Sequence, residues 1–542
     1  MKRASAVEQG RKIRGAVLVL LASGMLALGA NAAQQTATRS FEKSLTMGAN
    51  QTFSLETKFG EVRIHGENGR EVKITATIRS QAGSQSEAEK HAEEISIEVT
   101  QDAAGIKVRT VYPEDRLILR IHKGSAYSVD YDIAMPQDSK LWVRSGFGNT
   151  EIRGVQGWAD IENGNGQLTS RDSGSTKLVN SFGTVEASGA TGNVWIVNNN
   201  GSVKVSAVKG ALDVKDRFAS ITVNNIQGAV TLSGGNGPVE LTDAETSTIS
   251  DSFGPVTARH IHGDLTVNSN NGQIDVDTVQ GSATLTGSFG AINFTNVTGS
   301  VKCNSSNGKV QGGPAGGEVY VKTSFGEVSL EQIGGAVQVE DSNGNITAKE
   351  IKGKAEFNTS FGSIEASGLR KGVKATTGNG RISLSDVGGD AAAKTSFGSV
   401  NVQRVNGHLK IENSNGPVEA NSVSGDASAK MSFGSVTLED VGGSITVDNQ
   451  NGAVKVSEAR TSSGCKSVNV KTSFAPIQVR IAEGSGYNVS ARTSFGRISS
   501  ELPVTSSGQM GGDSLNGKIG NGGCTMSLTN SNGSIEILKL AK

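Results

Sequence analysis

Two dipeptides, Phe-Gly and Asn-Gly, alternate along this chain at an almost constant spacing. The step from each Phe to the next Asn is always the same, as from Phe147 to Asn165, and the step from each Asn to the next Phe differs from it by at most one residue. A short repeat kept in register over about 300 residues is typical of stacked architectures, in which each unit contacts only its neighbours. The Phe positions are Phe147, Phe182, Phe218, Phe253, Phe289, Phe325, Phe361, Phe397 and Phe433, and the Asn positions are Asn165, Asn200, Asn236, Asn271, Asn307, Asn343, Asn379, Asn415 and Asn451. At Phe218 the residue that follows is Ala219 in place of glycine.

Each unit carries apolar residues at fixed offsets from its Phe or Asn. The unit that begins at Phe433 has apolar residues at +3, +5, +8, +12 and +14, and the unit that begins at Asn415 repeats this pattern. Alternation with a period of two predicts strands. Glycines at +1 and +10 predict the corners, because a glycine tolerates close backbone approach and positive φ. For Phe433 these residues are Val436, Leu438, Val441, Ile445 and Val447, with Gly434 and Gly443.

A unit this short, of about 18 residues, cannot bury its own apolar side and must stack on its neighbours. At about 3.3 Å per residue it closes a perimeter of about 60 Å, which suits a three-sided coil around a narrow core. The sequence therefore predicts an all-β fold, a single-stranded parallel β-solenoid (β-helix) with about 18 residues per coil. The alternative is a flattened coil of about 36 residues, twice that perimeter, with Phe and Asn in separate columns on opposite edges.

The alternation of Phe and Asn has two possible explanations. Small residues precede Phe397 (Ala391 and Ala393), whereas larger ones precede Asn415 (Leu409 and Ile411). Large beside small fills a core, so we expect the Phe rings to point inward. The alternative is an aromatic ladder on the surface, which would suit sugars or bases.

The chain divides into four parts by the regularity of the repeat. We expect a signal peptide over 1–32, an N-terminal cap with irregular first coils over 33–140, the regular solenoid over 141–460, and C-terminal coils with insertions over 461–542. The first part has a basic start, a short apolar run and a small-residue cleavage site at 30–32, which are the marks of export. An uncleaved anchor is the alternative. Export implies the periplasm, the cell surface or secretion, and no transmembrane segment follows in the mature chain.

Both ends depart from the strict period. Residues Ser86 to Glu94 predict a short capping helix, with Ser86 and Glu89 as a capping box. The apolar run Leu117 to Ile121 predicts a strand. Toward the C-terminus Phe474 and Phe495 continue the series, residues 508–523 predict a glycine-rich loop, and Asn532 begins a last coil. Caps are expected because an open coil is an exposed sheet edge.

Charge and composition exclude several functional classes. The chain has 52 basic and 52 acidic residues, and removal of 1–32 takes away five basic residues and one acidic residue, which leaves 47 and 51. This balance is not the basic patch that nucleic acids require. His260 and His262 share a strand face, but a metal site needs three or four ligands, so we expect solvated side chains. No catalytic constellation, metal site or cofactor motif stands out, and we predict no enzyme activity.

Three cysteines are too few for a disulfide scaffold. Cys465 and Cys524 both lie in C-terminal insertions, about three coils apart, and in an oxidising compartment they are a possible disulfide. Cys303 takes the +14 offset after Phe289, which predicts a small core residue.

The recurring units Ser-Phe-Gly-x-Val and Ser-Asn-Gly-x-Val, the C-terminal segment from Gly517 to Lys539 and the signal peptide resemble the bacterial "putative adhesin" domain-of-unknown-function family. The resemblance covers roughly Phe53 to Lys539. It implies a β-solenoid, with a right-handed coil, and a role at a surface, and it brings no catalytic residue. We expect an adhesin-like or envelope-interaction protein that contacts an unidentified envelope, glycan or protein surface. The alternatives are a carbohydrate-active enzyme on a β-helix and a purely structural envelope spacer.

Overall fold

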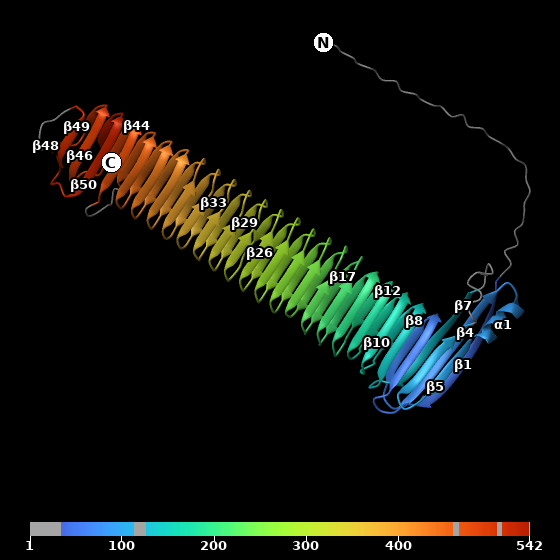
Figure 1. Cartoon of the computed structure of the whole chain (residues 1–542). Helices are drawn as coiled ribbons and strands as arrows, with labels where there is room; N and C mark the ends of the chain where they lie inside the picture. The colour runs from blue at the N-terminus through green and yellow to red at the C-terminus, as the bar shows by residue number, and fades with distance from the viewer. Residues whose placement is uncertain (1–33, 113–125, 459–465, 507–511, 541–542) are drawn as a thin grey trace, which may run out of the picture.

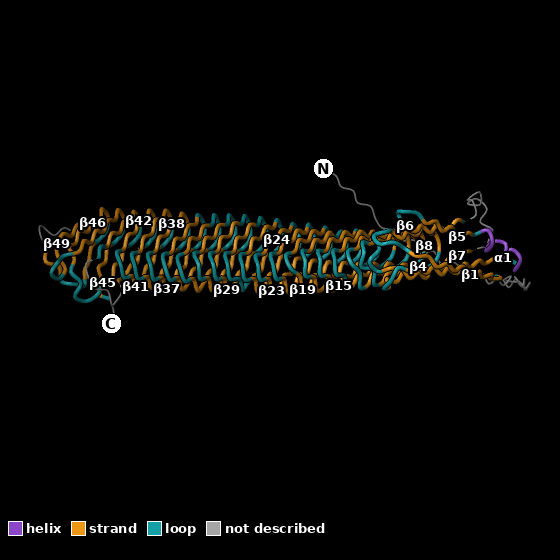
Figure 2. The backbone as a smooth tube through the Cα atoms, turned by 90° about the horizontal axis from the view of Figure 1, so that it is seen from below, coloured by secondary structure: helices purple, strands orange, loops and turns teal. Residues whose placement is uncertain are grey.

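The protein is a long rod of stacked coils (Figure 1). The structure, a computed structural model, describes residues 34–112, 126–458, 466–506 and 512–540. The expected signal peptide (1–32) and the predicted strand over 117–121 lie outside these residues. Figure 2 shows the coils stacked side by side along the rod axis, with the helix α1 (Gln85–Glu94) at the N-terminal end.

Each regular coil contributes one strand to each of two parallel sheets. In the regular part, sheet A contains β9 (Thr150–Arg153), β11 (Leu168–Arg171), β13 (Val185–Ser188), β15 (Val203–Val208), β17 (Ile221–Ile226), β19 (Val239–Ala244), β21 (Val256–Ile261), β23 (Ile274–Val279), β25 (Ile292–Val297), β27 (Val310–Gly312), β29 (Val328–Ile333), β31 (Ile346–Ile351), β33 (Ile364–Leu369), β35 (Ile382–Val387), β37 (Val400–Val405), β39 (Val418–Val423), β41 (Val436–Val441) and β43 (Val454–Glu458). Sheet B contains β8 (Lys140–Phe147), β10 (Ala159–Asn165), β12 (Thr176–Phe182), β14 (Val194–Asn200), β16 (Leu212–Asp216), β18 (Val230–Ser233), β20 (Ser247–Asp251), β22 (Leu265–Ser269), β24 (Ala283–Gly287), β26 (Val301–Ser305), β28 (Val319–Lys322), β30 (Val337–Glu340), β32 (Ala355–Asn358), β34 (Val373–Thr376), β36 (Ala391–Thr395), β38 (Leu409–Asn415), β40 (Ala427–Phe433), β42 (Ile445–Asn451) and β44 (Val468–Phe474).

The coil length is confirmed by the strand register. Val400 of β37 pairs with Val418 of β39, and Leu409 of β38 pairs with Ala427 of β40, so each residue lies over the one that follows it by a single repeat unit. The alternative coil of twice that length is therefore wrong. The predicted inward offsets are also confirmed, because Val436, Leu438, Val441, Ile445 and Val447 are all buried.

The third side of the coil is a bend within the strands of sheet A and not a strand of its own. In β37 the neighbouring residues Gln403 and Arg404 both face solvent, between the buried Val402 and Val405. Arg404 has φ of 55°, in the left-handed region. A left-handed residue in a ladder bends the strand as a β-bulge does. This third corner recurs along the rod, at Asp172, Ala207, Asn225, Asp243, His260, Thr278, Asn296, Gln332, Glu350, Asp386, Arg404, Ser422 and Asp440.

The N-terminal end is closed by antiparallel strands. In sheet A, β1 (Gln35–Thr46) pairs with β4 (Glu71–Ala82), β4 pairs with β7 (Ala126–Pro136), and β7 lies beside β3 (Val62–Glu67), which pairs with β9. In sheet B, β5 (Ser96–Gln101) pairs with β6 (Gly105–Val111), and β2 (Thr52–Phe59) lies between β6 and β8. The first coil of the chain is thus covered by segments that follow it in sequence.

The capping helix is present, but it begins earlier than predicted. The N-cap is Ser84, whose hydroxyl accepts a hydrogen bond from the amide of Glu87. Ser84 and Glu87 have the same spacing as the expected pair Ser86 and Glu89, two residues upstream. The helix buries Ala88 and Ala92 against the cap.

The C-terminal end is closed by a coil inserted out of sequence order. Strand β50 (Cys524–Asn532) lies between β44 and β46 (Tyr487–Phe495), and β51 (Ile535–Lys539) lies between β45 (Ile477–Ile481) and β47 (Ile498–Ser500). The expected loop over 508–523 is wrong in part, since β49 (Ser514–Ile519) pairs antiparallel with β46 and with β48 (Val504–Ser506). The last coil in sequence is therefore not the last coil in space.

Candidate functional site: an exposed row of phenylalanines

A polar side chain stands two residues before almost every Phe or Asn of the repeat, and it points into the rod. In one coil the hydroxyl of Thr395 accepts a hydrogen bond from the amide of Gly398, and it donates to the carbonyl of Gly380 in the preceding coil. Asn413 takes the same place in the next coil, where its side-chain amide donates both to the carbonyl of Gly398 in the preceding coil and to that of Gly416 in its own. We call this set the inner polar ladder. Its buried members are Thr57, Ser145, Asn163, Asn180, Asn198, Asp216, Asp251, Ser269, Ser305, Thr323, Asp341, Thr359, Thr377, Thr395, Asn413, Asn449, Thr472, Thr493 and Asn530.

The inner polar ladder explains why the expectation of inward Phe rings is wrong. Ala391, Ala393 and Thr395 alternate inward along β36, and alternation would also bring Phe397 inside. The chain instead turns at Thr395, whose hydroxyl forms hydrogen bonds with glycine backbone in two successive coils. Phe397 lies on the outside of this turn, and 65% of its surface is exposed. The following Gly398 lies so close to the previous coil that an added Cβ would be 1.8 Å from the Gly380 carbonyl oxygen. Backbone contacts between coils thus form this corner, the Phe rings lie outside it, and the alternative of a surface ladder is the one found.

Eleven phenylalanines share this exposed corner and form what we call the Phe row. Their exposed fractions run from 52% at Phe433 to 76% at Phe495. The Phe row consists of Phe147, Phe182, Phe218, Phe253, Phe289, Phe325, Phe361, Phe397, Phe433, Phe474 and Phe495.

Phe and Asn occupy one continuous column. Phe147 pairs with Asn165, and Asn165 pairs with Phe182. In the middle of the rod the amide of Phe397 donates to the carbonyl of Gly378, and the amide of Asn415 donates to that of Ser396. Neighbouring strands lie about 4.8 Å apart, so the rings recur about every 10 Å along the rod.

The inserted C-terminal coil preserves the alternation. It places Asn532 between Phe474 and Phe495, which would otherwise be neighbours. At the other end Phe59 pairs directly with Phe147, and their rings stack with centroids 5.5 Å apart. Where the rod meets its N-terminal cap, two stacked phenylalanines therefore replace the alternation of Phe and Asn.

Three members of the inner polar ladder are aspartates, and their environment raises their pKa values. Burial raises the pKa of Asp251 to about 6, against the opposing effect of backbone amides of Gly254, Phe253 and Ser252. Burial also raises the pKa of Asp216 and of Asp341. Each sits at a place where most coils have a neutral Asn, Ser or Thr.

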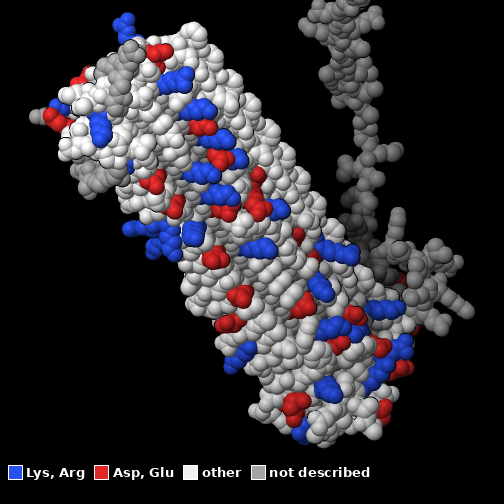
Figure 3. All heavy atoms as spheres, turned by 60° about the vertical axis from the view of Figure 1, so that its left-hand side comes forward, with Lys and Arg blue, Asp and Glu red and all other residues white. Residues whose placement is uncertain are grey.

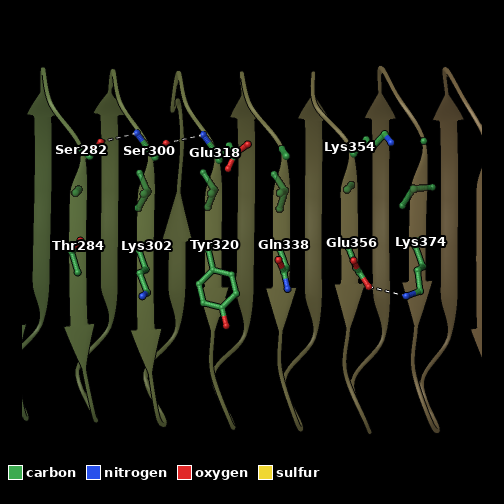
Figure 4. A pocket seen from close by; sticks show the side chains of 18 of the residues that line it. Ser282, Thr284, Ser300, Lys302, Glu318, Tyr320, Gln338, Lys354, Glu356 and Lys374 are labelled. Carbon is green, nitrogen blue, oxygen red and sulfur yellow. Dashed lines mark hydrogen bonds and ion pairs between the residues drawn. The ribbon is translucent and has the colours of Figure 1, made fainter.

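A hollow of about 690 Å³ lies on the outer face of sheet B (Figure 4). Thr284, Lys302, Tyr320, Gln338, Glu356 and Lys374 point outward from successive strands in one row along it. The carboxylate of Glu356 lies 2.8 Å from the Lys374 ammonium group, which lowers the pKa of Glu356. A general acid needs the opposite shift.

A second hollow, of about 1590 Å³, follows the third corner. Glu350, Asp386, Arg404 and Asp440 line it. Arg404 contacts both oxygens of Asp386, at 2.6 and 2.9 Å, and lowers the pKa of that carboxyl group. Arg404 and Asp386 thus neutralise each other across two successive coils, and Asp440 accepts a hydrogen bond from Ser422.

The remaining residues singled out from the sequence are spread along the rod. His260 is a third-corner residue, and its Nδ1 lies 3.2 Å from Asp243, whereas His262 faces solvent two residues on. Over the described ranges, no three His, Cys, Asp or Glu side chains gather as metal ligands, and no helix is long and apolar enough to cross a membrane. Cys303 is buried in the core as expected. Cys465 lies outside the described residues, so its pairing with Cys524 stays a prediction.

Basic and acidic side chains are interleaved on the surface. Figure 3 shows Lys and Arg beside Asp and Glu along the visible face, with broad uncharged areas between them. Successive coils supply the pairs, for example Lys394 with Glu412 at 3.3 Å. The Phe row is therefore a feature of apolar character on a rod whose charges balance locally.

Comparisons with known proteins give little beyond this. No protein-family model and no curated protein sequence matches the chain. Among solved structures, the chain is similar to one described as a "putative cell adhesion protein" from Clostridium sporogenes ATCC 15579, with 12% identity and a TM-score of 0.20. The match covers 41% of this chain and 99% of that one. Similarity at this level carries no argument about function.

Proposed function

We propose that this chain is an exported, adhesin-like envelope protein that binds through its surface and carries out no catalysis. The observation that supports this is the Phe row. Single exposed apolar residues scattered over a surface are common, but exposed aromatic rings gathered in one regular row along a single corner favour an interaction surface. Aromatic side chains, phenylalanine among them, are also enriched in protein interfaces relative to the rest of the surface.

The geometry of the row favours an extended partner. Eleven rings at about 10 Å intervals span about 100 Å. One ring contributes little, but many weak contacts to one long partner add through effective concentration. Small uncharged residues flank the rings, except that Arg217 precedes Phe218, so the contact is mainly apolar and tolerant of sequence or surface detail. A bacterial envelope, a long glycan or a fibrous matrix protein presents such a surface.

Two other candidates have observations in their favour. The continuous hydrogen-bonded stack is suited to a purely structural envelope spacer with no ligand. The hollow on sheet B contains Glu318, Glu356 and Asp390, and a carbohydrate-active enzyme would need such carboxylates. Lys374 lowers the pKa of Glu356, so Glu356 does not supply the carboxyl group of raised pKa that glycoside hydrolysis requires.

The test is a binding screen of the purified chain that lacks 1–32, against whole bacterial cells, a glycan panel and matrix proteins. One variant replaces four central rings by serine, and a matched variant replaces the four asparagines that alternate with them. We expect binding that is lost in the Phe variant and kept in the Asn variant. Absence of binding to every probe would favour the spacer. The substituted positions are Phe289, Phe325, Phe361 and Phe397, and Asn307, Asn343, Asn379 and Asn415.

Export is tested separately by fractionation of cells that make the full chain with a C-terminal tag. We expect recovery outside the cytoplasm with residues 1–32 removed. Cytoplasmic recovery of a chain that retains 1–32 would contradict export without affecting the binding proposal.

A further inference from the structure

All three tryptophans of this 542-residue chain lie in the first regular coils. Trp142 is on β8, Trp195 is on β14, and Trp158 directly precedes β10. In the strand register Trp142 pairs with Asp160, Asp160 with Lys177, and Lys177 with Trp195. The paired residues therefore form one row on the outer face of sheet B, away from the corner that carries the Phe row. This row consists of Trp142, Asp160, Lys177 and Trp195.

The rings have fixed positions. Trp158 and Trp195 contact each other, with ring centroids 5.4 Å apart and an interplanar angle of 59°. The guanidinium of Arg144 lies 4.2 Å from the centre of the Trp142 ring, a cation–π contact. Trp158 is 40% exposed. The patch thus offers two aromatic platforms, the Trp142 ring on β8 and the Trp158 and Trp195 pair, and together they span the three strand spacings from β8 to β14, or about 14 Å along the rod.

The charges between the platforms cancel. Arg144 forms ion pairs with Asp160, at 3.3 Å, and with Glu162, and Lys177 lies 3.5 Å from Asp160. Two cations and two carboxylates leave no excess of either sign. Beside them is a shallow hollow of about 390 Å³ that Arg144, Glu162 and Val179 help to line.

The aromatic rings and the balanced charges together determine which kind of ligand the patch can bind. A charged ligand would meet a like charge in the patch, and a purely apolar ligand would bury the ion pairs without replacing their contacts with water. A sugar ring has an apolar face that packs on an aromatic ring and hydroxyl groups at its edge that hydrogen-bond with carboxylates and guanidinium groups. Because the two platforms together span more than the length of one sugar ring, a short extended chain fits better than a monosaccharide.

We propose that the tryptophan patch, formed by Trp142, Trp158, Trp195, Arg144 and Asp160, binds a neutral oligosaccharide of β-1,4-linked pyranoses. Such chains are extended ribbons, so they can lie on a flat sheet face and reach both platforms. The site is separate from the Phe row, and its function does not depend on whether the Phe row binds a partner.

The placement of the tryptophans makes the test direct, because the intrinsic tryptophan emission of the protein arises from this patch alone. The mature chain is titrated with cellotetraose and with the tetramer of β-1,4-linked N-acetylglucosamine, and with maltotetraose as a sugar of different shape. We expect a saturable change in emission with one or both β-1,4-linked tetramers and a much weaker response to maltotetraose.

Variants distinguish binding at the patch from other effects. Trp195→Ala and Trp142→Ala are each expected to weaken binding at least about tenfold, as for a truncated aromatic anchor, whereas Trp195→Phe retains most of it. Phe361→Ser in the distant Phe row is the matched control and leaves the titration unchanged. Isothermal titration calorimetry measures the same affinities for variants with altered emission.

Three results would overturn the proposal. These are no saturable response to either β-1,4-linked tetramer, an affinity that both alanine variants leave unchanged, and an emission change that follows protein concentration without sugar. The last result would assign the patch to contacts between copies of the chain. Failure of these titrations with intact binding by the Phe row, or the reverse, separates the two sites.

Discussion

Two phenylalanines of a single coil provide a sharp stability comparison. Phe357 is on β32 and is fully buried, between Val339 and Ala375 of the adjacent coils. Phe361 lies four residues later, at the exposed corner, with 63% of its surface in solvent. Both are replaced by alanine, one at a time.

The structure predicts very different costs for the two substitutions. Phe357→Ala leaves a cavity in a narrow core and is expected to cost about 3–5 kcal/mol. Full burial of a phenylalanine is worth about 1.5–3 kcal/mol, and Phe361 buries only about a third of its surface, so Phe361→Ala is expected to cost about 0.5–1 kcal/mol.

Local hydrogen exchange is the suitable assay, because long repeat arrays do not unfold in a single two-state step. The amides of β32 and of the adjacent strands β30 and β34 report the free energy of local opening. We expect a large loss of protection there for Phe357→Ala and a small one for Phe361→Ala. Equal costs, or a larger cost at Phe361, would refute the outward placement of the Phe row.

Three further predictions concern the ladders and the ends of the rod. Burial raises the pKa of Asp251 to about 6, so ionisation of this carboxyl group destabilises the folded protein as the pH rises from about 4 through 6. Asp251→Asn should therefore stabilise the protein at pH 7 and change its stability little at pH 4. The rise of this pKa from 3.8 to about 6 is worth at most about 3 kcal/mol, and solvent at the corner reduces the expected gain to about 1–2 kcal/mol. The gain is measured as the difference in melting temperature between the variant and the unmodified chain, and the same difference at pH 4 and pH 7 would contradict the prediction. Gly398→Ala should cost about 1–3 kcal/mol or more, because its Cβ would overlap the Gly380 carbonyl oxygen. Gly512→Ala, where nothing lies within 4 Å of the added Cβ, is the control, and equal melting temperatures for both would contradict the close stacking. Deletion of residues 524–542 removes the coil between β44 and β46 and should expose 466–506 to limited proteolysis while leaving 141–451 resistant; a resistant 466–506 would mean that this coil is dispensable.

Much of the regular fold could be predicted from the sequence, because each coil repeats the same local physics. Strand residues such as Val436 and Leu438 alternate with a period of two, and the glycines mark the tight approaches, so period and inward offsets together define the coil. The helix was predictable for the same reason, although two capping boxes of equal spacing, at Ser84 and Ser86, compete within three residues.

The orientation of the Phe rings was not predictable by extension of the strand pattern. Period-two alternation holds along β36 up to Thr395 and ends there, because the side chain of Thr395 bonds to glycine backbone and the chain turns. A signal was nevertheless present, since a polar Asn, Asp, Ser or Thr stands two residues before most Phe and Asn positions. A small polar residue next to a glycine turn is typical of a side chain that caps that turn.

Features that are formed by segments far apart in the sequence could not be predicted from the sequence. Nothing local in Cys524–Asn532 shows that it lies between β44 and β46 and not after β47. The tryptophan patch depends on the register of four coils, although the concentration of all the tryptophans within Trp142–Trp195 was visible.

A graded series of ring removals tests the central claim, that the Phe row is the binding surface, more directly than any other measurement. Two, four, six and eight of its phenylalanines are replaced by serine from the centre outward, and binding to whole bacterial cells is measured for each variant. We predict that the apparent affinity falls steeply with the number of rings removed, while the matched asparagine series stays at the level of the unmodified chain. An affinity independent of ring number would contradict the claim.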